Sequence, residues 1–240
     1  MSVILDVRHA TKRFGGLMAN EDITFQVQQG EVLGVVGPNG AGKTTLFNSL
    51  SNFHKLTSGE IFFEGKRINH LQPYQVAHLG IARTFQKPQA MGEMTVYENV
   101  LVAAMGKDKD EKRTEENTRL TVAMCGLAGL TDKMAKSLNV MQKKRLEIAR
   151  AIAIKPKLLL LDETMAGLTG VERVEAVNLV RRIHQMGVTI LMIEHVMEVV
   201  MNVSDRVMVL DSGKVLAVGT PEEIGDNDDV IQAYLGGKKM

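Results

Sequence analysis

The sequence predicts an α/β fold built around a phosphate-binding loop. Residues 37–44 match the glycine-rich pattern G-x-x-x-x-G-K-[ST]. This run follows the apolar stretch Val32–Val36, which is typical of a buried strand, and it opens a stretch of helical character at residues 44–50. Two further apolar runs, residues 158–161 and 188–193, are typical of strands at the centre of a parallel sheet.

The loop residues have the properties that phosphate binding requires. Glycines let backbone N–H groups turn toward a phosphate, and the helix N-terminus adds partial positive charge. We expect Lys43 to reach the β- and γ-phosphates and the Thr44 hydroxyl to bind Mg²⁺. A chance glycine turn is the alternative, and the flanking strand and helix argue against it. The residues predicted to bind the nucleotide here are Gly37, Pro38, Asn39, Gly40, Ala41, Gly42, Lys43, Thr44 and Thr45.

Length and composition narrow the class of protein. A chain of 240 residues fits one large domain, or a domain with a subdomain. The net charge of +1 gives no reason to expect a nucleic-acid partner. The single cysteine, Cys125, excludes an internal disulfide and suits a reducing cytoplasm. No apolar run approaches the ~18 residues of a membrane span, and early charges argue against a signal peptide.

Before the loop, residues 4–8 and 23–27 alternate apolar and polar side chains, which predicts antiparallel strands with one solvated face. Between them, residues 12–16 indicate a turn that contains Phe14, with an ordinary loop phenylalanine as the plain interpretation. After the loop we expect a strand at residues 60–63, a hairpin tip at 64–66 and a helix over Pro73–Leu79. A further strand is expected at residues 81–85, directly before Gln86.

The sequence pattern of residues 88–150 differs from that of the flanking segments and predicts a mostly helical insertion. Thr95 with Glu98 forms a capping-box pattern that opens a helix running to about Met105. Residues 107–116 are nearly all charged with mixed signs, which favours a solvated helix or loop over a binding patch, and residues 120–124 continue as helix. We therefore expect one domain, residues 1–240, with an α/β body (1–87 and 151–240) and a helical subdomain (88–150).

Two carboxylates, Asp162 and Glu163, follow the apolar run 158–161. Carboxylates at the end of a buried strand are costly unless a cation or water meets them. We interpret Asp162 as a ligand that holds Mg²⁺ through its water shell and Glu163 as the group that polarises an attacking water. A pair of solvated strand-end acids is the alternative, and the phosphate loop argues against it.

His195 follows the neighbouring strand 188–193, and so it can point at the same phosphate, although a lone histidine is usually structural. The rest of the chain predicts an amphipathic helix at residues 171–186 and a hairpin formed by residues 206–210 and 214–218. A short helix capped by Thr220 and a last helix at residues 230–235 complete the prediction.

Together these motifs resemble the ATPase subunit of an ATP-binding cassette (ABC) transporter, in the family's order and over essentially the whole chain. The resemblance implies the P-loop NTPase fold of ABC ATPase type, a mixed sheet core with an antiparallel β-subdomain and a helical subdomain. It implies ATP and Mg²⁺ as cofactors and two ATPase subunits that close head to tail. It further implies that Phe14 stacks on adenine, that Gln86 senses Mg²⁺ and touches the membrane subunit, and that His195 contacts the γ-phosphate. The implied catalytic residues are Glu163, His195, Lys43 and Gln86, and the implied metal-binding residues are Thr44, Gln86 and Asp162.

Four stretches resemble in particular the ATPase subunits of branched-chain amino acid importers: residues 80–86, 94–99, 145–151 and 229–236. This resemblance implies uptake of branched-chain amino acids or a related small solute. The implied partners are transmembrane permease subunits, a second ATPase subunit and, indirectly, a periplasmic or extracellular solute-binding protein. The implied location is the cytoplasmic side, peripheral on the inner face of the cell membrane.

The pattern departs from the family at the signature, where Leu-Ser-Gly-Gly-Gln is replaced by Leu138-Asn139-Val140-Met141-Gln142. We expect weaker clamping of the partner's ATP by this face, since glycine allows close backbone approach. Thr164 stands where the family usually has proline. A heterodimer with a second ATPase therefore fits better than a homodimer. Two alternatives remain: a nucleotide-binding regulatory subunit that hydrolyses little, and a soluble ABC protein outside transport, which usually has two cassettes or a basic surface.

Overall fold

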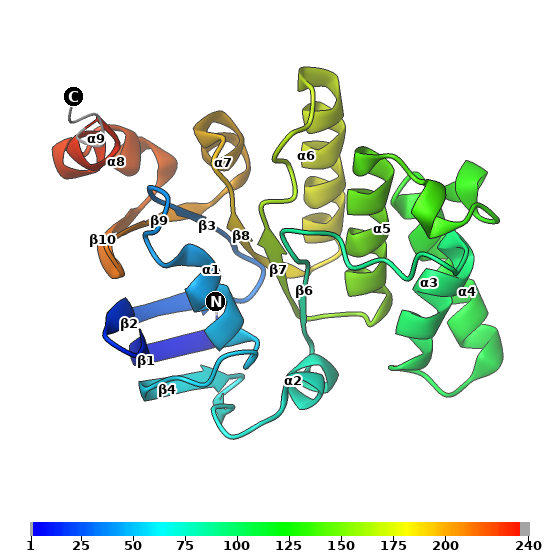
Figure 1. The fold of residues 1–240 in the computed structure, drawn as a ribbon, viewed down its shortest axis with the longest axis horizontal. Coiled ribbons are helices and arrows are strands. Elements are labelled where there is room, and N and C mark those ends of the chain that lie inside the picture. The colour runs from blue at the N-terminus through cyan, green and yellow to red at the C-terminus, as the bar shows by residue number, and fades with distance from the viewer. Residues whose placement is uncertain (1, 236–240) are drawn as a thin grey trace.

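The computed structural model describes residues 2–235, which form two β-sheets with helices between and beside them (Figure 1). The smaller sheet is antiparallel in the order β2-β1-β4-β5. Its strands alternate buried and exposed side chains, so that one face lies on the core. Their bounds are β1 (Val3–Phe14), β2 (Leu17–Gln28), β4 (Ser58–Phe63) and β5 (Lys66–Arg67).

The larger sheet has the order β10-β9-β3-β8-β7-β6, parallel except for the β9–β10 hairpin. Strands β3, β7 and β8 are buried at every position, as apolar runs in a covered parallel sheet must be. The bounds are β3 (Val32–Val36), β6 (Ile81–Arg83), β7 (Leu158–Asp162), β8 (Thr189–Ile193), β9 (Arg206–Asp211) and β10 (Lys214–Gly219).

Successive leucines of β7 point into two different cores. Leu158 and Leu160 join a cluster with α1 (Lys43–Leu50) and the antiparallel sheet, whereas Leu159 and Leu161 join a cluster with the helices on the other face. The strand period of two residues therefore divides one leucine run between two layers. Helix α1 lies between the sheets, so the phosphate-binding loop at its start is held by both (Figure 1).

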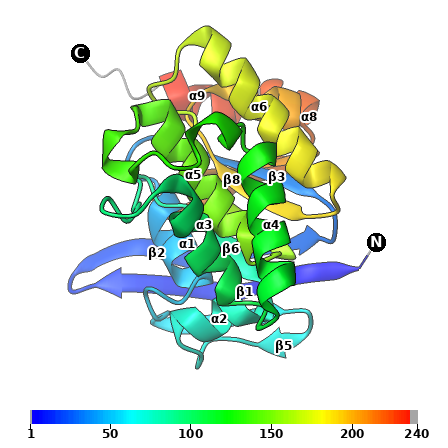
Figure 2. The same cartoon turned by 90° about the vertical axis from the view of Figure 1, so that its right-hand side faces the viewer.

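Helices α3 (Val96–Met105), α4 (Glu111–Met124) and α5 (Val140–Ala153) pack against one another at the side of the larger sheet away from the antiparallel sheet (Figures 1 and 2). Buried residues of these helices share one core cluster with α6 (Gly170–Gln185). The remaining helices are α2 (Pro73–Leu79), α7 (Met197–Val203), α8 (Pro221–Gly225) and α9 (Asp228–Leu235), with short 3₁₀ turns at Ala128–Leu130 and Ala135–Ser137. In residues 2–235 no helix is long and apolar enough to cross a membrane.

Several expected boundaries were wrong. Strand β1 runs to Phe14, so that the expected turn at residues 12–16 shrinks to Gly15 and Gly16. Side-chain pattern had not revealed this length, because residues 11–14 at the end of the strand are intermediate or exposed and carry no apolar alternation. Strand β6 ends at Arg83 and not at residue 85. The second part of the charged run, residues 111–116, forms one continuous helix with the residues after it, α4, capped by the side chain of Asp110.

Candidate nucleotide-binding site

Strand β3 and helix α1 position a glycine loop that closes on its own lysine. Lys43 Nζ donates to the carbonyl oxygens of Gly37 at 2.6 Å and Pro38 at 2.9 Å. Gly42 has φ 94°, and a Cβ there would lie 2.3 Å from the Ala19 carbonyl oxygen. Burial lowers the pKa of Lys43, and the nearby charges of Glu163 and Asp162 partly oppose that shift. The loop thus places a buried cation where a phosphate would arrive.

A cleft of about 320 Å³ opens over this loop. Residues 39–45, which were predicted to bind nucleotide, line it together with Glu163 and His195. Three residues at the start of β2, Leu17, Met18 and Ala19, also line it. Sequence reasoning had missed them because nothing in an edge strand marks which side chains turn toward a neighbouring loop.

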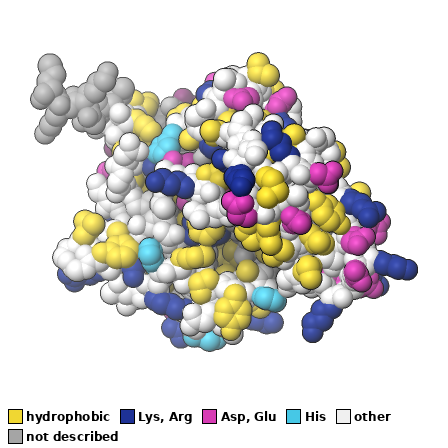
Figure 3. All heavy atoms as spheres, turned by 45° about the vertical axis from the view of Figure 1, so that its right-hand side comes forward, with side chains coloured by type: hydrophobic (Ala, Val, Ile, Leu, Met, Phe, Trp, Pro, Cys, Tyr) yellow, Lys and Arg dark blue, Asp and Glu magenta, His cyan; other side chains and the backbone are white. Residues whose placement is uncertain are grey.

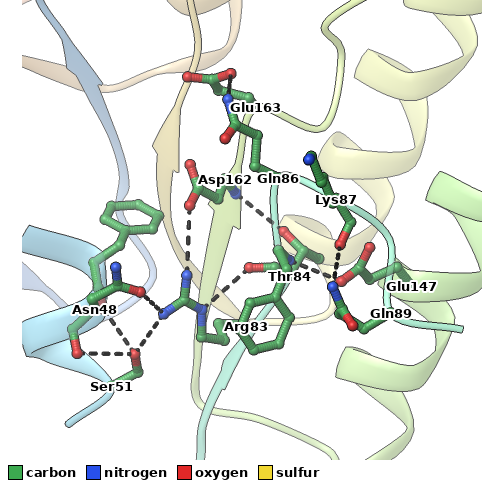
Figure 4. Close-up of polar contacts among 12 residues, drawn as sticks. Asn48, Ser51, Arg83, Thr84, Gln86, Lys87, Gln89, Glu147, Asp162 and Glu163 are labelled. Atoms are coloured by element: carbon green, nitrogen blue, oxygen red, sulfur yellow. Dashed lines mark hydrogen bonds and ion pairs between the residues drawn. The ribbon is translucent and has the colours of Figure 1, made fainter. Parts of the chain in front are cut away.

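Glu163 lies at the wall of the cleft between two predicted catalytic side chains. Its Oε1 is 2.5 Å from His195 Nε2, and its Oε2 accepts from Gln86 Nε2 at 2.7 Å. Figure 4 shows Gln86 reaching Glu163 from the segment after β6. Glu163 has φ 50°, an uncommon conformation for a non-glycine residue, and its N–H donates to Ile193 O at 2.9 Å. The carboxyl ends of the neighbouring parallel strands β6, β7 and β8 therefore bring these residues together.

Asp162 is 1% exposed, and its two carboxylate oxygens have different surroundings. Oδ2 faces the Arg83 guanidinium at 3.5 Å, whereas Oδ1 is buried without a hydrogen-bond partner in residues 2–235. Burial raises the pKa of Asp162 to about 6, and the Arg83 charge opposes that rise. A buried, unpartnered carboxylate oxygen is suited to a cation. The described residues hold no cluster of three or more His, Cys, Asp or Glu, so the remaining ligands would have to be hydroxyl, amide, water or phosphate oxygens.

Comparison with known proteins decides the family. Residues 20–166 match the model of the ABC transporter family, and residues 214–239 match that of the branched-chain amino acid ATP-binding cassette transporter. The chain belongs to the ABC transporter family. It is 39% identical to the branched-chain amino acid transport ATP-binding protein BraF of Pseudomonas aeruginosa and 38% identical to LivG of Escherichia coli, each over 97% of this chain and 98% of the relative.

Solved structures agree with this membership. An ATP-binding cassette of an ABC transporter in its ADP conformation superposes with a TM-score of 0.89 at 32% identity, covering 98% of this chain and 100% of that one. A nucleotide-free cassette gives 0.88 at 31%, covering 97% and 99%. The predicted fold class is confirmed, and the chain is an ATP-binding cassette ATPase of the ABC transporter family.

Phe14 is one predicted site residue that does not line the cleft. It is 42% exposed, its ring meets His54 edge-on with centroids 5.3 Å apart, and Lys12 Nζ lies 4.8 Å from its centroid. An exposed ring at the end of β1 remains accessible to a planar ligand, so its stacking on adenine stays a prediction.

The signature segment forms the N-terminus of α5. Asn139 caps the helix: its Oδ1 accepts from the Gln142 N–H at 2.8 Å, and its own N–H donates to Gln142 Oε1 at 3.1 Å. Val140 is 63% exposed, whereas Met141 is only 8% exposed and packs into the core. Of these two adjacent side chains, Val140 is thus the one that projects from this face.

Four charged residues near the site had not been singled out from the sequence. Lys144 Nζ donates to the carbonyl oxygens of Glu163 and Ala166. Glu194 accepts from the Met165 N–H at 2.8 Å, and burial raises its pKa to about 7. The sequence contained one indication that Glu194 lies near the site, because this residue directly follows a buried strand. The other two are Arg83 and Glu147.

Proposed function

We propose that this chain is the ATP-hydrolysing subunit of an importer for branched-chain amino acids or a related small solute. The observation that carries the proposal is the position of Glu163 between Gln86 and His195, at the wall of the cleft that residues 39–45 line. The names of the relatives BraF and LivG supply the solute class.

Each cleft residue has a task in this proposal. Lys43 neutralises charge on the β- and γ-phosphates, and His195 donates to the γ-phosphate. Glu163 orients the attacking water and accepts its proton. Each Glu163 oxygen has one such partner, His195 or Gln86, and keeps a second lone pair that can accept a hydrogen bond from the attacking water.

We also propose that Mg²⁺ binds together with ATP in this cleft. It would supply positive charge to the phosphates and polarise them. Asp162, Thr44 and Gln86 would hold it, because they offer carboxylate, hydroxyl and amide oxygens, the hard donors that this cation prefers. The buried Asp162 Oδ1, which has no partner in the described chain, supports this assignment.

We further propose that the second ATPase subunit is a different chain. Val140 projects an apolar side chain at the N-terminus of α5, where glycine would allow a nucleotide to approach. The Asn139 amide oxygen is already used in its own cap. This face is therefore a poor clamp for a partner's ATP, whereas the chain's own cleft residues are complete. A regulatory subunit that hydrolyses little is the second candidate, favoured only by this altered face.

A groove of about 450 Å³ is the proposed docking place for a permease helix. Figure 3 shows hydrophobic side chains gathered around a hollow on this face, between α2 and the helices α3 and α5. Phe53, Tyr74 and Phe85 contribute aromatic walls, with Phe53 and Tyr74 exposed by 51% and 64%. Docking here places the chain on the cytoplasmic face of the membrane, where a solute-binding protein acts on it only through the permease.

The test is steady-state ATPase activity of the purified chain with its permease pair, alone and then with the partner ATPase. We expect turnover only with the partner, lost by about 10²-fold or more in Glu163→Gln, which keeps the size of the side chain but removes the base. Uptake of leucine into vesicles by the same complex tests the solute class. Ordinary turnover without the partner would contradict the heterodimer, and bound ATP without turnover in either mixture would favour the regulatory subunit.

A further inference from the structure

Arg83, the last residue of β6, is a buried arginine at the centre of a polar network (Figure 4). Its side chain is only 7% exposed. Nη1 donates to Asn48 Oδ1 at 2.8 Å and to Ser51 Oγ at 2.9 Å, both at the end of α1. Nε donates to Thr84 O at 3.3 Å, and Nη2 lies 3.5 Å from Asp162 Oδ2. The guanidinium therefore joins α1, the segment before Gln86, and the end of β7.

The same guanidinium is packed against aromatic rings that belong to the groove. Its carbon lies 4.4 Å from the centroid of Phe85 and 5.2 Å from that of Phe53, and these two rings meet edge-on with centroids 5.4 Å apart. Arg83 itself lines the groove. A segment seated in the groove would press on the rings, and a displaced ring would displace the guanidinium between them and Asp162, since interiors are close-packed.

The two carboxylate oxygens of Asp162 differ in their partners. Oδ2 is the one opposite Arg83, and Oδ1 is the one left without a partner in residues 2–235. At 3.5 Å the contact of Arg83 with Oδ2 is an ion pair more than a tight hydrogen bond. It occupies Oδ2 and so leaves Oδ1 as the oxygen that is free to take another partner.

We propose that Arg83 is a positioning residue that fixes the Asp162 carboxylate and connects it to Phe53 and Phe85 in the groove. The connection to the groove rests on the proposed function, because it assumes a permease segment as occupant. The connection to Asp162 does not. Only arginine can fill this positioning role, because its planar guanidinium has several N–H donors and can contact α1 and β7 at once. A lysine ammonium is a single point charge.

The first arm of the test uses the isolated chain and N-methylanthraniloyl-ATP as a fluorescent probe. In Arg83→Lys we expect the Mg²⁺ concentration for half-maximal probe binding to rise about 10-fold, the size typical for loss of a group that supports a metal ligand. Binding of the probe in EDTA should stay unchanged, which a general loss of structure would not allow. Arg67→Lys, an exposed arginine on β5, is the matched control.

A change of less than about 2-fold in Arg83→Lys, with the fold retained by circular dichroism, would overturn the link to Asp162. If that variant does not fold, Asn48→Ala decides the question. It removes one anchor of the guanidinium but leaves Arg83 in place, and it should shift the Mg²⁺ midpoint in the same direction by a smaller factor. An unchanged midpoint in Asn48→Ala would then count against the proposal.

The second arm uses the complete transporter and Phe53→Ala, which removes an exposed groove wall without touching the cleft. We expect the stimulation of ATPase activity by the solute-loaded binding protein to fall by severalfold while the complex still assembles. In the Arg83→Lys background the same substitution should have little further effect, because interacting residues are not additive. Additive losses would overturn the link to the groove. Failure of the wild-type complex to assemble or to import would instead refute the proposed function.

Discussion

Gly40 and Gly42 lie in the same loop but in different surroundings. Both have positive φ, 84° and 94°. A Cβ on Gly40 would meet open space, whereas a Cβ on Gly42 would lie 2.3 Å from the Ala19 carbonyl oxygen and 2.4 Å from Asn20 Nδ2. A side chain at Gly40 would therefore carry only the cost of a left-handed backbone, whereas a side chain at Gly42 would add the cost of a steric clash.

We predict that Gly40→Ala lowers the free energy of unfolding by about 1–2 kcal/mol, the cost of the left-handed conformation alone. Gly42→Ala should cost more, because the start of β2 must also move, and it should abolish nucleotide binding. Urea unfolding and binding of a fluorescent ATP analogue measure the two effects. Equal losses in both variants would show that the contact with Ala19 does not matter.

Among individual site residues, those that belong to a spaced motif were predicted from the sequence, whereas those outside any motif were missed. The phosphate loop and the Asp162–Glu163 pair were recognisable because their chemistry is contiguous in the chain. Arg83 was part of a stretch that resembled a family, yet its contacts to Asn48 and Asp162 depend on which strands become neighbours. No local pattern contains that information.

Helix α5 shows how one element serves both stability and function. Its first turn is closed by the Asn139–Gln142 capping box, and the exposed Val140 follows at the first helical position. We predict that Asn139→Ala lowers the free energy of unfolding by about 1 kcal/mol, because the Gln142 N–H loses its acceptor.

Asn139→Ser is the matched variant, since serine caps helices about as well as asparagine and is also the residue expected in the family's signature. It should leave the free energy of unfolding within a few tenths of a kcal/mol of the wild type. Denaturant unfolding of the three proteins measures the difference. If alanine and serine destabilised equally, the observed cap would contribute nothing.

Element types were predicted well where periodicity is strong, and element ends less well. Buried strands β7 and β8 stood out as apolar runs, whereas the length of β1 and the end of β6 did not follow from side-chain pattern. The ends depend on pairing with neighbours. The division of the domain at residues 87/88 and 150/151 stays a prediction, and α5 runs across the second boundary to Ala153.

At the scale of the whole molecule, Glu147 joins the helices to the sheet. It lies on α5, is 6% exposed, and its Oε1 accepts from the Phe85 N–H at 2.9 Å, directly before Gln86. Burial raises the pKa of Glu147 to about 7, with the Phe85 hydrogen bond and the charges of Arg150 and Arg83 opposing the rise. Between pH 4.5 and about 7 the folded protein thus holds a proton there that the unfolded chain has largely released.

This shift gives a pH dependence with a definite sign. The folded state binds more protons than the unfolded chain between the ordinary pKa of 4.5 and about 7, so the contribution of Glu147 to stability falls as the pH rises through that window. Glu147→Gln keeps an acceptor for the Phe85 N–H but cannot ionise. We predict that its free energy of unfolding exceeds that of the wild type by less than about 1 kcal/mol at pH 5 and by up to about 3 kcal/mol at pH 8, at ~1.4 kcal/mol per pKa unit.

Urea unfolding of both proteins at several values between pH 5 and pH 8 tests this dependence, with Glu111→Gln at the exposed start of α4 as the control. The control measures how much of any difference comes from replacing an exposed glutamate by glutamine. A Glu147→Gln advantage that stayed constant, or grew toward acid, would mean that the carboxylate is ionised in the folded protein at low pH. Arg83 and Arg150 would then be its ion-pair partners, and the junction between helices and sheet would depend on charge instead of on a buried neutral acid.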